Sequence, residues 1–484
     1  MRSFSLKPAL YVVGMLIVVL GVFMLVPGFV DVAAGDSDWR GFFIAGAGTS
    51  IVGLLFLLAN REERITLNRR QAFVLTVLSW LLVAACSAVP FFFSRLNISY
   101  TDAFFEAISG LTTTGSTVLT GLDTAPPGIL LWRSLLHWLG GVGIVMMALA
   151  LLPFLRVGGM QLFRMESSDT QEKVVARVNQ LGLGVVAVYV VMTILCTLAY
   201  VIGGMTVFEA VNHAMATVST GGYSTSDQSM GHFDSKFILW VAIIFMGLGS
   251  LPFTLYLQVA RGNVSALYRN IQVRSFVAFI SIVSVLMACW LWWTRGMEPF
   301  DALTHVAFNV MSVVSTTGFA SLDYTLWGPL AVASFFALTF VGGCTGSTAG
   351  GIKIFRFQIA WRLYRTHIHR LISPNVVDVP RYGDRKLDVD VGGSVLIFFF
   401  VYIGTVGVIT LFLALVGLDW VTAVSGAATA VGNVGPGLGD VIGPAGNFKT
   451  LPDSAKWALA LGMLLGRLEF FTVLVLAMPR FWRT

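Results

Sequence analysis

The chain has 484 residues, of which 56% are hydrophobic and only 12% are charged, and its formal net charge is +6. The charged share is about half that of an average soluble domain. Too few polar residues are present to cover the surface of a soluble protein of this size, so the composition excludes a soluble globular fold. It indicates a helical bundle whose apolar outer surface faces lipid.

Ten apolar stretches are long enough to cross a bilayer. In chain order they occupy residues 9–30, 42–59, 72–93, 128–154, 182–202, 237–259, 275–294, 328–341 with a continuation, 391–417 and 455–478. When the N-terminus is placed in the cytoplasm, lysines and arginines concentrate in the inner segments, as the positive-inside rule requires. The sequence therefore predicts an all-α polytopic membrane protein with both termini in the cytoplasm.

Four outer segments are too long and too apolar to be simple loops. They occupy residues 100–119, 207–225, 300–321 and 419–437. Each begins with a helical stretch too short to span the membrane and ends in a small, polar motif that contains glycine. The glycines of these motifs, which recur at intervals of about one hundred residues, are Gly115, Gly221, Gly318 and Gly432.

This recurrence predicts four copies of one unit, in the order span, half-helix, glycine loop, span. Two extra N-terminal spans precede the copies. The expected divisions are 1–71 for the extra spans, then 72–160, 161–265, 266–385 and 386–484 for the four repeats. We expect the repeats to surround a central pore with pseudo-fourfold symmetry.

The four glycine loops have the chemistry of a cation filter. Irregular backbone is tolerated at membrane depth where it lines a watery path. Each half-helix would direct the negative end of its dipole towards a common centre, and loop carbonyls would replace the hydration shell of a cation. Four ordinary Thr-Gly turns are the alternative, which four motifs in register disfavour. The expected filter residues are Thr113, Thr114, Gly115, Ser116, Ser219, Thr220, Gly221, Gly222, Thr316, Thr317, Gly318, Phe319, Ala430, Val431, Gly432 and Asn433.

An aspartate follows each of the four loops. These residues are Asp123, Asp227, Asp323 and Asp440. Four carboxylates at an outer mouth would raise the local concentration of cations. Aspartate also caps surface turns, so the sequence leaves both interpretations open.

The eighth apolar stretch is interrupted by ten small residues. They are Gly342, Gly343, Cys344, Thr345, Gly346, Ser347, Thr348, Ala349, Gly350 and Gly351. Each glycine costs a helix about 1 kcal/mol relative to alanine, so we expect a flexible intramembrane loop below the third filter loop, able to plug the path. Close helix packing through small residues is the alternative. A phosphate-binding loop is excluded, because Ile352 stands where that motif needs lysine.

Arg467 lies in the middle of the tenth stretch, where a charge facing lipid would cost a few kcal/mol. We expect it to face the bundle interior below the filter, near the glycine-rich loop, and to hinder cation passage. A buried ion pair is the alternative, although Glu469 is not an obvious partner because it points to another side of the helix. Arg133 is expected to anchor its span at the membrane interface.

The four loops, the segment from Gly350 to Lys353, the segment from Arg133 to Gly143 and the Gly466-Arg467 pair resemble the TrkH/KtrB/HKT superfamily of cation transporters, and most of all its bacterial TrkH branch. The resemblance covers essentially the whole chain. It implies four M1–P–M2 repeats, a homodimer in the bacterial inner membrane and a cytoplasmic ring of TrkA-type nucleotide-binding subunits. It also implies that the ten-residue loop is the gate and that glycine in all four filter loops favours potassium.

The predicted function is therefore K⁺ uptake through a filter gated by an intramembrane loop. A Na⁺-permeable pore or an H⁺- or Na⁺-coupled symporter of the same superfamily is the alternative. An enzyme is not expected, because the spans hold few acids, histidines or nucleophiles. We expect K⁺ but no organic cofactor, and no nucleic-acid partner. The basic inner segment 356–386 fits a regulatory subunit and anionic lipid equally well.

Overall fold

The computed structural model describes residues 5–61, 67–150, 171–376, 379–383, 385–387 and 389–483. Over these residues the chain is helical apart from loops and one small hairpin, in which β1 (Arg381–Tyr382) pairs antiparallel with β2 (Arg385–Lys386). The all-α prediction agrees with this architecture. The end of the predicted span 128–154 and the predicted repeat boundary at 160 lie outside the described residues.

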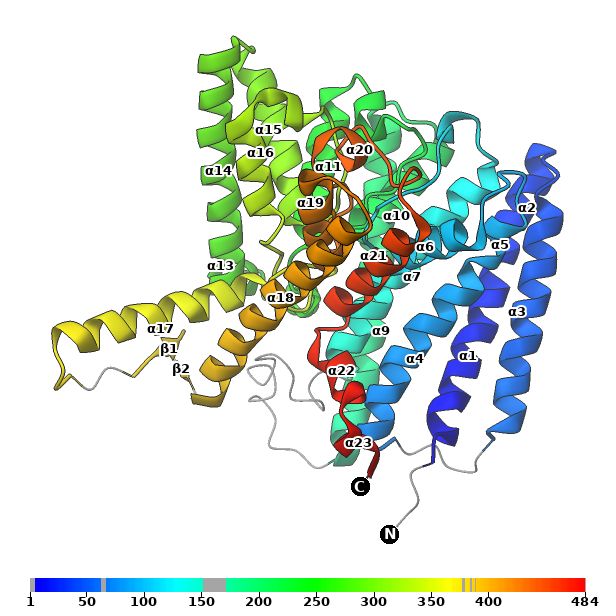
Figure 1. The fold of residues 1–484 in the computed structure, drawn as a ribbon, viewed down its shortest axis with the longest axis horizontal. Helices are drawn as coiled ribbons and strands as arrows, with labels where there is room; N and C mark the ends of the chain where they lie inside the picture. Colours follow the sequence, from blue (N-terminus) through cyan, green and yellow to red (C-terminus); the bar gives the residue numbers. More distant parts are fainter. Residues whose placement is uncertain are drawn as a thin grey trace.

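The two extra N-terminal spans form one flank of the molecule (Figure 1). The first is divided into α1 (Lys7–Phe23) and α2 (Leu25–Ala34), and the second is α3 (Trp39–Ala59). A Cβ atom added to Gly14 or Gly21 would come within 3.0 Å of backbone atoms of α3. Glycine therefore lets the two helices approach more closely than larger residues would allow, which is how helices associate in lipid.

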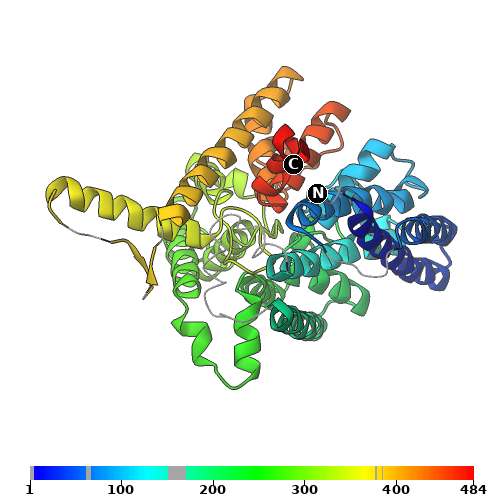
Figure 2. The same ribbon diagram turned by 90° about the horizontal axis from the view of Figure 1, so that it is seen from below.

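Apart from α17 (Ile354–Ile372), which extends outward, the remaining helices are arranged around a common centre (Figure 2). Four times they repeat a long helix, a short buried helix and a second membrane helix. The first repeat holds α4 (Arg69–Ser87), α5 (Val89–Phe92), α6 (Tyr100–Leu111) and α7 (Pro127–Ala150). The second holds α9 (Gln171–Ile202), α10 (Val207–Val218), α11 (Lys236–Gly249) and α12 (Phe253–Ala260). After α13 (Ser265–Arg269), the third holds α14 (Ile271–Arg295), α15 (Pro299–Val314), α16 (Pro329–Leu338) and α17 (Ile354–Ile372). The fourth holds α18 (Val389–Leu415), α19 (Trp420–Gly432), α20 (Gly439–Ile442), α21 (Asp453–Arg467), α22 (Phe471–Leu474) and α23 (Pro479–Arg483).

The short helices α6, α10, α15 and α19 have 12 to 16 residues, and we call them the pore helices. Local capping explains where three of them begin. Ser99 and Asp419 each accept a hydrogen bond from the third residue of their helix, and Thr206 forms a capping box with Glu209. Hydrogen bonds from the side chain and backbone N–H of Thr422 also lower the pKa of Asp419 below its usual 3.8.

Three predicted spans are interrupted by a sharp bend or by irregular chain. Among the described residues, seven helices are long and apolar enough to span a membrane, and two further spans are helix pairs bent sharply at a break. The α11–α12 pair bends by 94° just before Pro252, which has no N–H to continue the helix, and the α21–α22 pair bends by 105°. The eighth predicted span is the ten-residue α16 followed by irregular chain and then α17, which projects from the body in Figure 1.

Candidate ion path: filter, vestibule and inner loop

The four loops that follow the pore helices share one backbone conformation. Immediately after the helix C-cap in three loops, and at the C-cap itself in the fourth, one residue has a φ between 51° and 57°: Thr113, Thr220, Thr316 and Asn433. Two residues further on, a glycine has a φ between 83° and 112°: Gly115, Gly222, Gly318 and Gly435. In each loop the residue between these two donates its backbone N–H to the carbonyl five residues earlier, at 2.8–3.0 Å.

This equivalence corrects the predicted register of two loops. The counterparts of Gly115 and Gly318 are Gly222 and Gly435, whereas the sequence reading aligned Gly221 and Gly432 with them. Gly432 is instead the last residue of α19, and a Cβ at Gly221 would collide with the ring of His137. Of the sixteen predicted filter positions, Ala430, Val431 and Gly432 therefore belong to a pore helix rather than to a loop.

The four equivalent glycines close a ring. A Cβ at each would come within 3.0 Å of a carbonyl oxygen in the next loop around the centre. The pairs, in order, are Gly115 with Gly221 O, Gly222 with Thr317 O, Gly318 with Val434 O, and Gly435 with Thr114 O. The positive φ values and this crowding both require glycine at these positions. Four segments that lie far apart in the sequence are thus brought together as a quasi-fourfold ring of main-chain carbonyls.

A cavity of about 270 Å³ lies against this ring and is lined by Gly115, Gly222, Gly318 and Pro436, one residue from each loop. Of the four predicted mouth aspartates, Asp227 lines the cavity, and it also accepts hydrogen bonds from the backbone N–H groups of residues 121 and 122. Asp323 accepts a hydrogen bond from the Thr325 N–H as a turn cap. Asp123 and Asp440 are exposed and lie outside the cavity lining.

The glycine-rich segment 342–351 is largely buried and is hydrogen-bonded to two of the four loops and to the end of the fourth pore helix. The Gly350 N–H donates to Thr316 Oγ1 at 2.6 Å, and the Gly351 N–H donates to the Gly432 carbonyl at 2.8 Å. Thr220 Oγ1 donates to Thr348 Oγ1 at 3.1 Å. Segment 342–351 is therefore a loop that contacts the filter region, and it is not the closely packed helix of the alternative.

Arg467 ends α21 and is 3% exposed. Its Nη1 donates to the carbonyl of Thr348 in the glycine-rich segment at 2.9 Å. The ion-pair alternative is wrong over the described residues, because Glu469 pairs with Arg356 instead. A small second cavity of about 30 Å³ is lined by Arg467, Glu469 and Gly350, among others.

A family model for the TrkH cation transport proteins matches residues 40–484 of the chain. The chain belongs to the TrkH cation transport protein family. It is 45% identical to the Trk system potassium uptake protein TrkI of Halomonas elongata over 477 residues, which cover 98% of this chain and 97% of the relative. It is 36% identical to the Trk system potassium uptake protein TrkH of Escherichia coli K12 over 481 residues, which cover 98% of both.

The fold of this TrkH-family member matches a solved relative over its full length. The crystal structure of the potassium transporter TrkH from Vibrio parahaemolyticus superposes with a TM-score of 0.92 at 32% identity, covering 99% of this chain and 100% of the other. The chain is thus a multi-pass membrane protein of a transport family, as expected, and not an enzyme.

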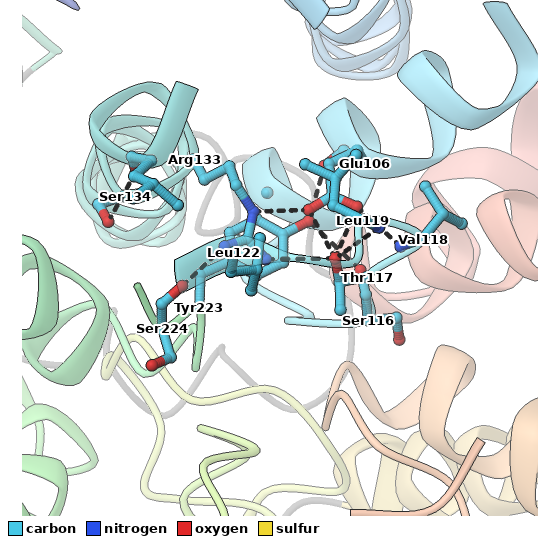
Figure 3. Close-up of polar contacts among 12 residues, drawn as sticks. Glu106, Ser116, Thr117, Val118, Leu119, Leu122, Arg133, Ser134, Tyr223 and Ser224 are labelled. Carbon is cyan, nitrogen blue, oxygen red and sulfur yellow. Dashed lines mark hydrogen bonds and ion pairs between the residues drawn. The ribbon is translucent and has the colours of Figure 1, made fainter. Parts of the chain in front are cut away.

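The prediction for Arg133 is wrong. The Arg133 side chain is not exposed as an interfacial anchor would be: it is 1% exposed and forms a buried ion pair with Glu106 of the first pore helix (Figure 3). Sequence reasoning missed Glu106 altogether. A signal was available, since Glu106 is an acid in the middle of an apolar half-helix, where an unpaired charge would be costly. Its partner could then be sought among the cations within the adjacent spans.

Proposed function

We propose that this chain is the membrane subunit of a potassium uptake system of the Trk type. The observation that carries the proposal is the quasi-fourfold ring formed by the loops at residues 113–116, 220–223, 316–319 and 433–436. Carbonyl rings of this kind replace the hydration shell of K⁺. The named relatives from Halomonas elongata and Escherichia coli are potassium uptake proteins and match the chain over nearly its whole length.

In this proposal a cation enters through the outer cavity, where the Asp227 carboxylate raises its local concentration. It loses water between the loop carbonyls, while the C-terminal ends of the four pore helices stabilise its charge. The glycine-rich segment then blocks the inner side of the ring through its contacts with Thr316, Thr220 and Gly432. Arg467 holds this segment and adds a fixed positive charge that opposes cation flow.

Selectivity for potassium is proposed because all four loops hold glycine at the equivalent position, so the ring is uniform in size. The alternative is a Na⁺-permeable pore, or a symporter coupled to H⁺ or Na⁺, with the same filter. The two differ in the ion gradients that drive flux. For a passive K⁺ pathway, net flux is zero at the K⁺ equilibrium potential. For a coupled transporter, the potential of zero net flux moves away from that value when the gradient of the second ion is changed.

The proposed assembly is a homodimer in the bacterial inner membrane, with both termini in the cytoplasm and a TrkA-type ring bound to the inner face. The described part of this face offers the exposed basic residues of α17, including Arg362 and Arg365. Membrane lipid with anionic headgroups competes for the same charges.

The test is uptake of ⁸⁶Rb⁺ into proteoliposomes that contain the purified chain, followed by single-channel recording in bi-ionic K⁺/Na⁺ solutions. We expect Rb⁺ uptake down a K⁺ gradient and a permeability ratio that favours K⁺. Gly115→Ser should reduce that ratio, because the side chain would strain a residue at φ 86° and crowd the Gly221 carbonyl. Absence of Rb⁺ uptake, or an unchanged ratio in this variant, would remove the support for a K⁺ filter.

A further inference from the structure

A buried ion pair lies directly behind the first two filter loops. Arg133 Nε donates to Glu106 Oε1 at 2.8 Å, and the two side chains are 1% and 0% exposed. Glu106 comes from the pore helix α6 and Arg133 from the membrane helix α7 (Figure 3). Two opposite charges so far from water need each other, because either one alone would be uncompensated.

The pair is bonded to the chain on both sides. Glu106 Oε2 accepts the backbone N–H of Val118 at 2.9 Å, and both carboxylate oxygens lie 3.0 Å from the Thr117 hydroxyl. These residues follow the first filter loop. On the other side, Arg133 Nη1 donates to the carbonyl of Ser224, which follows the second loop, at 2.8 Å. The ion pair thus fixes the separation of two neighbouring loops.

Tyr223 completes the connection. Its ring lies over the Arg133 guanidinium, 4.0 Å from ring centroid to the guanidinium carbon. Its hydroxyl donates to the Glu106 carbonyl at 2.8 Å and approaches the Ser116 carbonyl at 3.3 Å. Tyr223 immediately follows the filter glycine Gly222, so the ring position of that glycine depends on the same cluster.

The pseudo-symmetry shows how unusual this quadrant is. Each pore helix carries a polar side chain that hydrogen-bonds the stretch just after its own filter loop. These side chains are Glu106, His213, Asn309 and Ser425. Three of them bond with their own loop through uncharged hydroxyl, amide or imidazole groups. Of these four residues, Glu106 alone forms an ion pair with an arginine. That arginine also donates a hydrogen bond to the Ser224 carbonyl beside the neighbouring loop.

We propose that the Glu106–Arg133 pair is a specificity-determining positioning device for the filter. The pair keeps the first and second loops at a fixed distance from each other. The spacing of the carbonyl oxygens that these loops contribute then fits K⁺ better than the smaller Na⁺. It also cancels its own charge beside the ion path, since Arg133 lines the outer cavity. The inference rests on the proposed K⁺ filter and extends it to two residues outside the loops.

Two consequences separate positioning from a general structural role. Breaking the pair by either Glu106→Gln or Arg133→Gln should lower the K⁺ over Na⁺ permeability ratio, because in both variants the distance between the first and second loops is no longer held. The apparent KM for K⁺ should shift in opposite directions. Glu106→Gln leaves a positive charge behind the filter and raises KM, whereas Arg133→Gln leaves a negative charge and lowers KM. A variant that merely misfolds loses maximal flux without this pattern of signs.

The experiment uses purified full-length protein in proteoliposomes, with ⁸⁶Rb⁺ uptake for KM and bi-ionic recording for the permeability ratio. Asp102→Asn is the matched control, because it removes the other ion pair of α6, with Lys456, at the opposite end of the helix from the filter loop. We expect the ratio to fall about fivefold in both Gln variants, with opposite KM shifts of about threefold, and no change in the control. Arg133→Lys keeps the charge but cannot reach both loops, so it should lose selectivity without a shift in KM.

Permeability ratios within a factor of about 1.5 of the unsubstituted protein in both Gln variants would overturn the proposal. Equal losses in the Asp102→Asn control, or KM shifts of the same sign, would also overturn it. If the Gln variants cannot be purified, Arg133→Lys and Glu106→Asp decide the matter through the ratio alone. The starting protein must itself select K⁺; if it does not, the proposed function fails rather than this inference.

Discussion

The outer and inner halves of the proposed ion path follow different rules of symmetry. In the filter the four loops repeat the same pair of positive φ values and the same carbonyl contacts, although their sequences differ. In the inner half the four second membrane helices diverge: one is bent by 94°, one by 105°, and the one in the third repeat stops after the ten residues of α16 and continues as irregular chain.

This difference fits the roles proposed for the two halves. A dehydrated ion needs ligands at equal distances on all sides, so the filter backbone has to be nearly fourfold. Opening and closing need only one element that can move against fixed neighbours. The inner half therefore needs no fourfold symmetry, and one repeat supplies the glycine-rich segment while another supplies the buried Arg467.

The largest effect is expected from a substitution that disrupts the fourfold ring of carbonyls. Gly435→Ala places a side chain at φ 112° and within 3.0 Å of the Thr114 carbonyl. Strain of about 2 kcal/mol corresponds to about a 30-fold loss of the K⁺ over Na⁺ permeability ratio in bi-ionic recordings. Gly432→Ala is the control, because its backbone is helical and its nearest neighbours lie at 3.1 Å or more. An equal loss in both variants would contradict the corrected register.

The next largest effect is expected from removing the positive charge of Arg467. Arg467→Ala should raise ⁸⁶Rb⁺ flux about tenfold, because it deletes both the positive charge on the path and the bond to the Thr348 carbonyl. Replacement of the exposed Arg365 by alanine should leave flux in proteoliposomes unchanged. Unchanged flux in Arg467→Ala would show that this arginine is not a barrier.

A smaller effect loosens the glycine-rich segment without changing charge. Thr348 Oγ1 lies 3.0 Å from the Gly249 carbonyl and 3.1 Å from Thr220 Oγ1. Thr348→Val keeps the shape but loses these bonds, so open probability in single-channel recordings should rise about fivefold. Thr348→Ser keeps the hydroxyl and should behave like the starting protein. If the serine and valine variants gate alike, the hydroxyl does not hold the segment.

The smallest effect concerns the outer cavity. Asp227→Asn removes the carboxylate that lines it, so the apparent KM for K⁺ should rise about twofold at low ionic strength and recover at high salt. Asp440→Asn is the control, since Asp440 is exposed and lies outside the cavity lining. A shift that persists at high salt would indicate a local change of shape instead of long-range attraction.

Several features were accessible from sequence because they depend on local chemistry. The short pore helices follow from apolar runs too short to span, and Ser99, Thr206 and Asp419 mark their starts. The caps also indicate which glycines of the loops are equivalent, because Gly115, Gly222 and Gly435 each lie 16 residues after the cap of their own helix. Alignment on the first Gly of each motif ignored this spacing and misplaced two loops.

Other features depend on contacts between distant segments. Arg133 and Glu106 are 27 residues apart, and although an acid within an apolar half-helix implies a partner, the helix patterns do not show which cation it meets. Glu469 was set aside as a partner for Arg467, yet it binds Arg356, which is 113 residues away and on the helix after the glycine-rich segment. A sharp bend after Arg467 redirects Glu469, and a regular helix assumed from the sequence cannot show such a bend.

The sequence by itself determined that this is a multi-pass membrane protein and that one pattern recurs four times, because lipid imposes long apolar runs and a repeated unit leaves a repeated pattern. The tertiary structure alone decided which glycines are equivalent, which span breaks and which buried charges pair. Those outcomes depend on the close packing of four repeats around one centre, where a carbonyl or a guanidinium meets neighbours that lie far away along the chain.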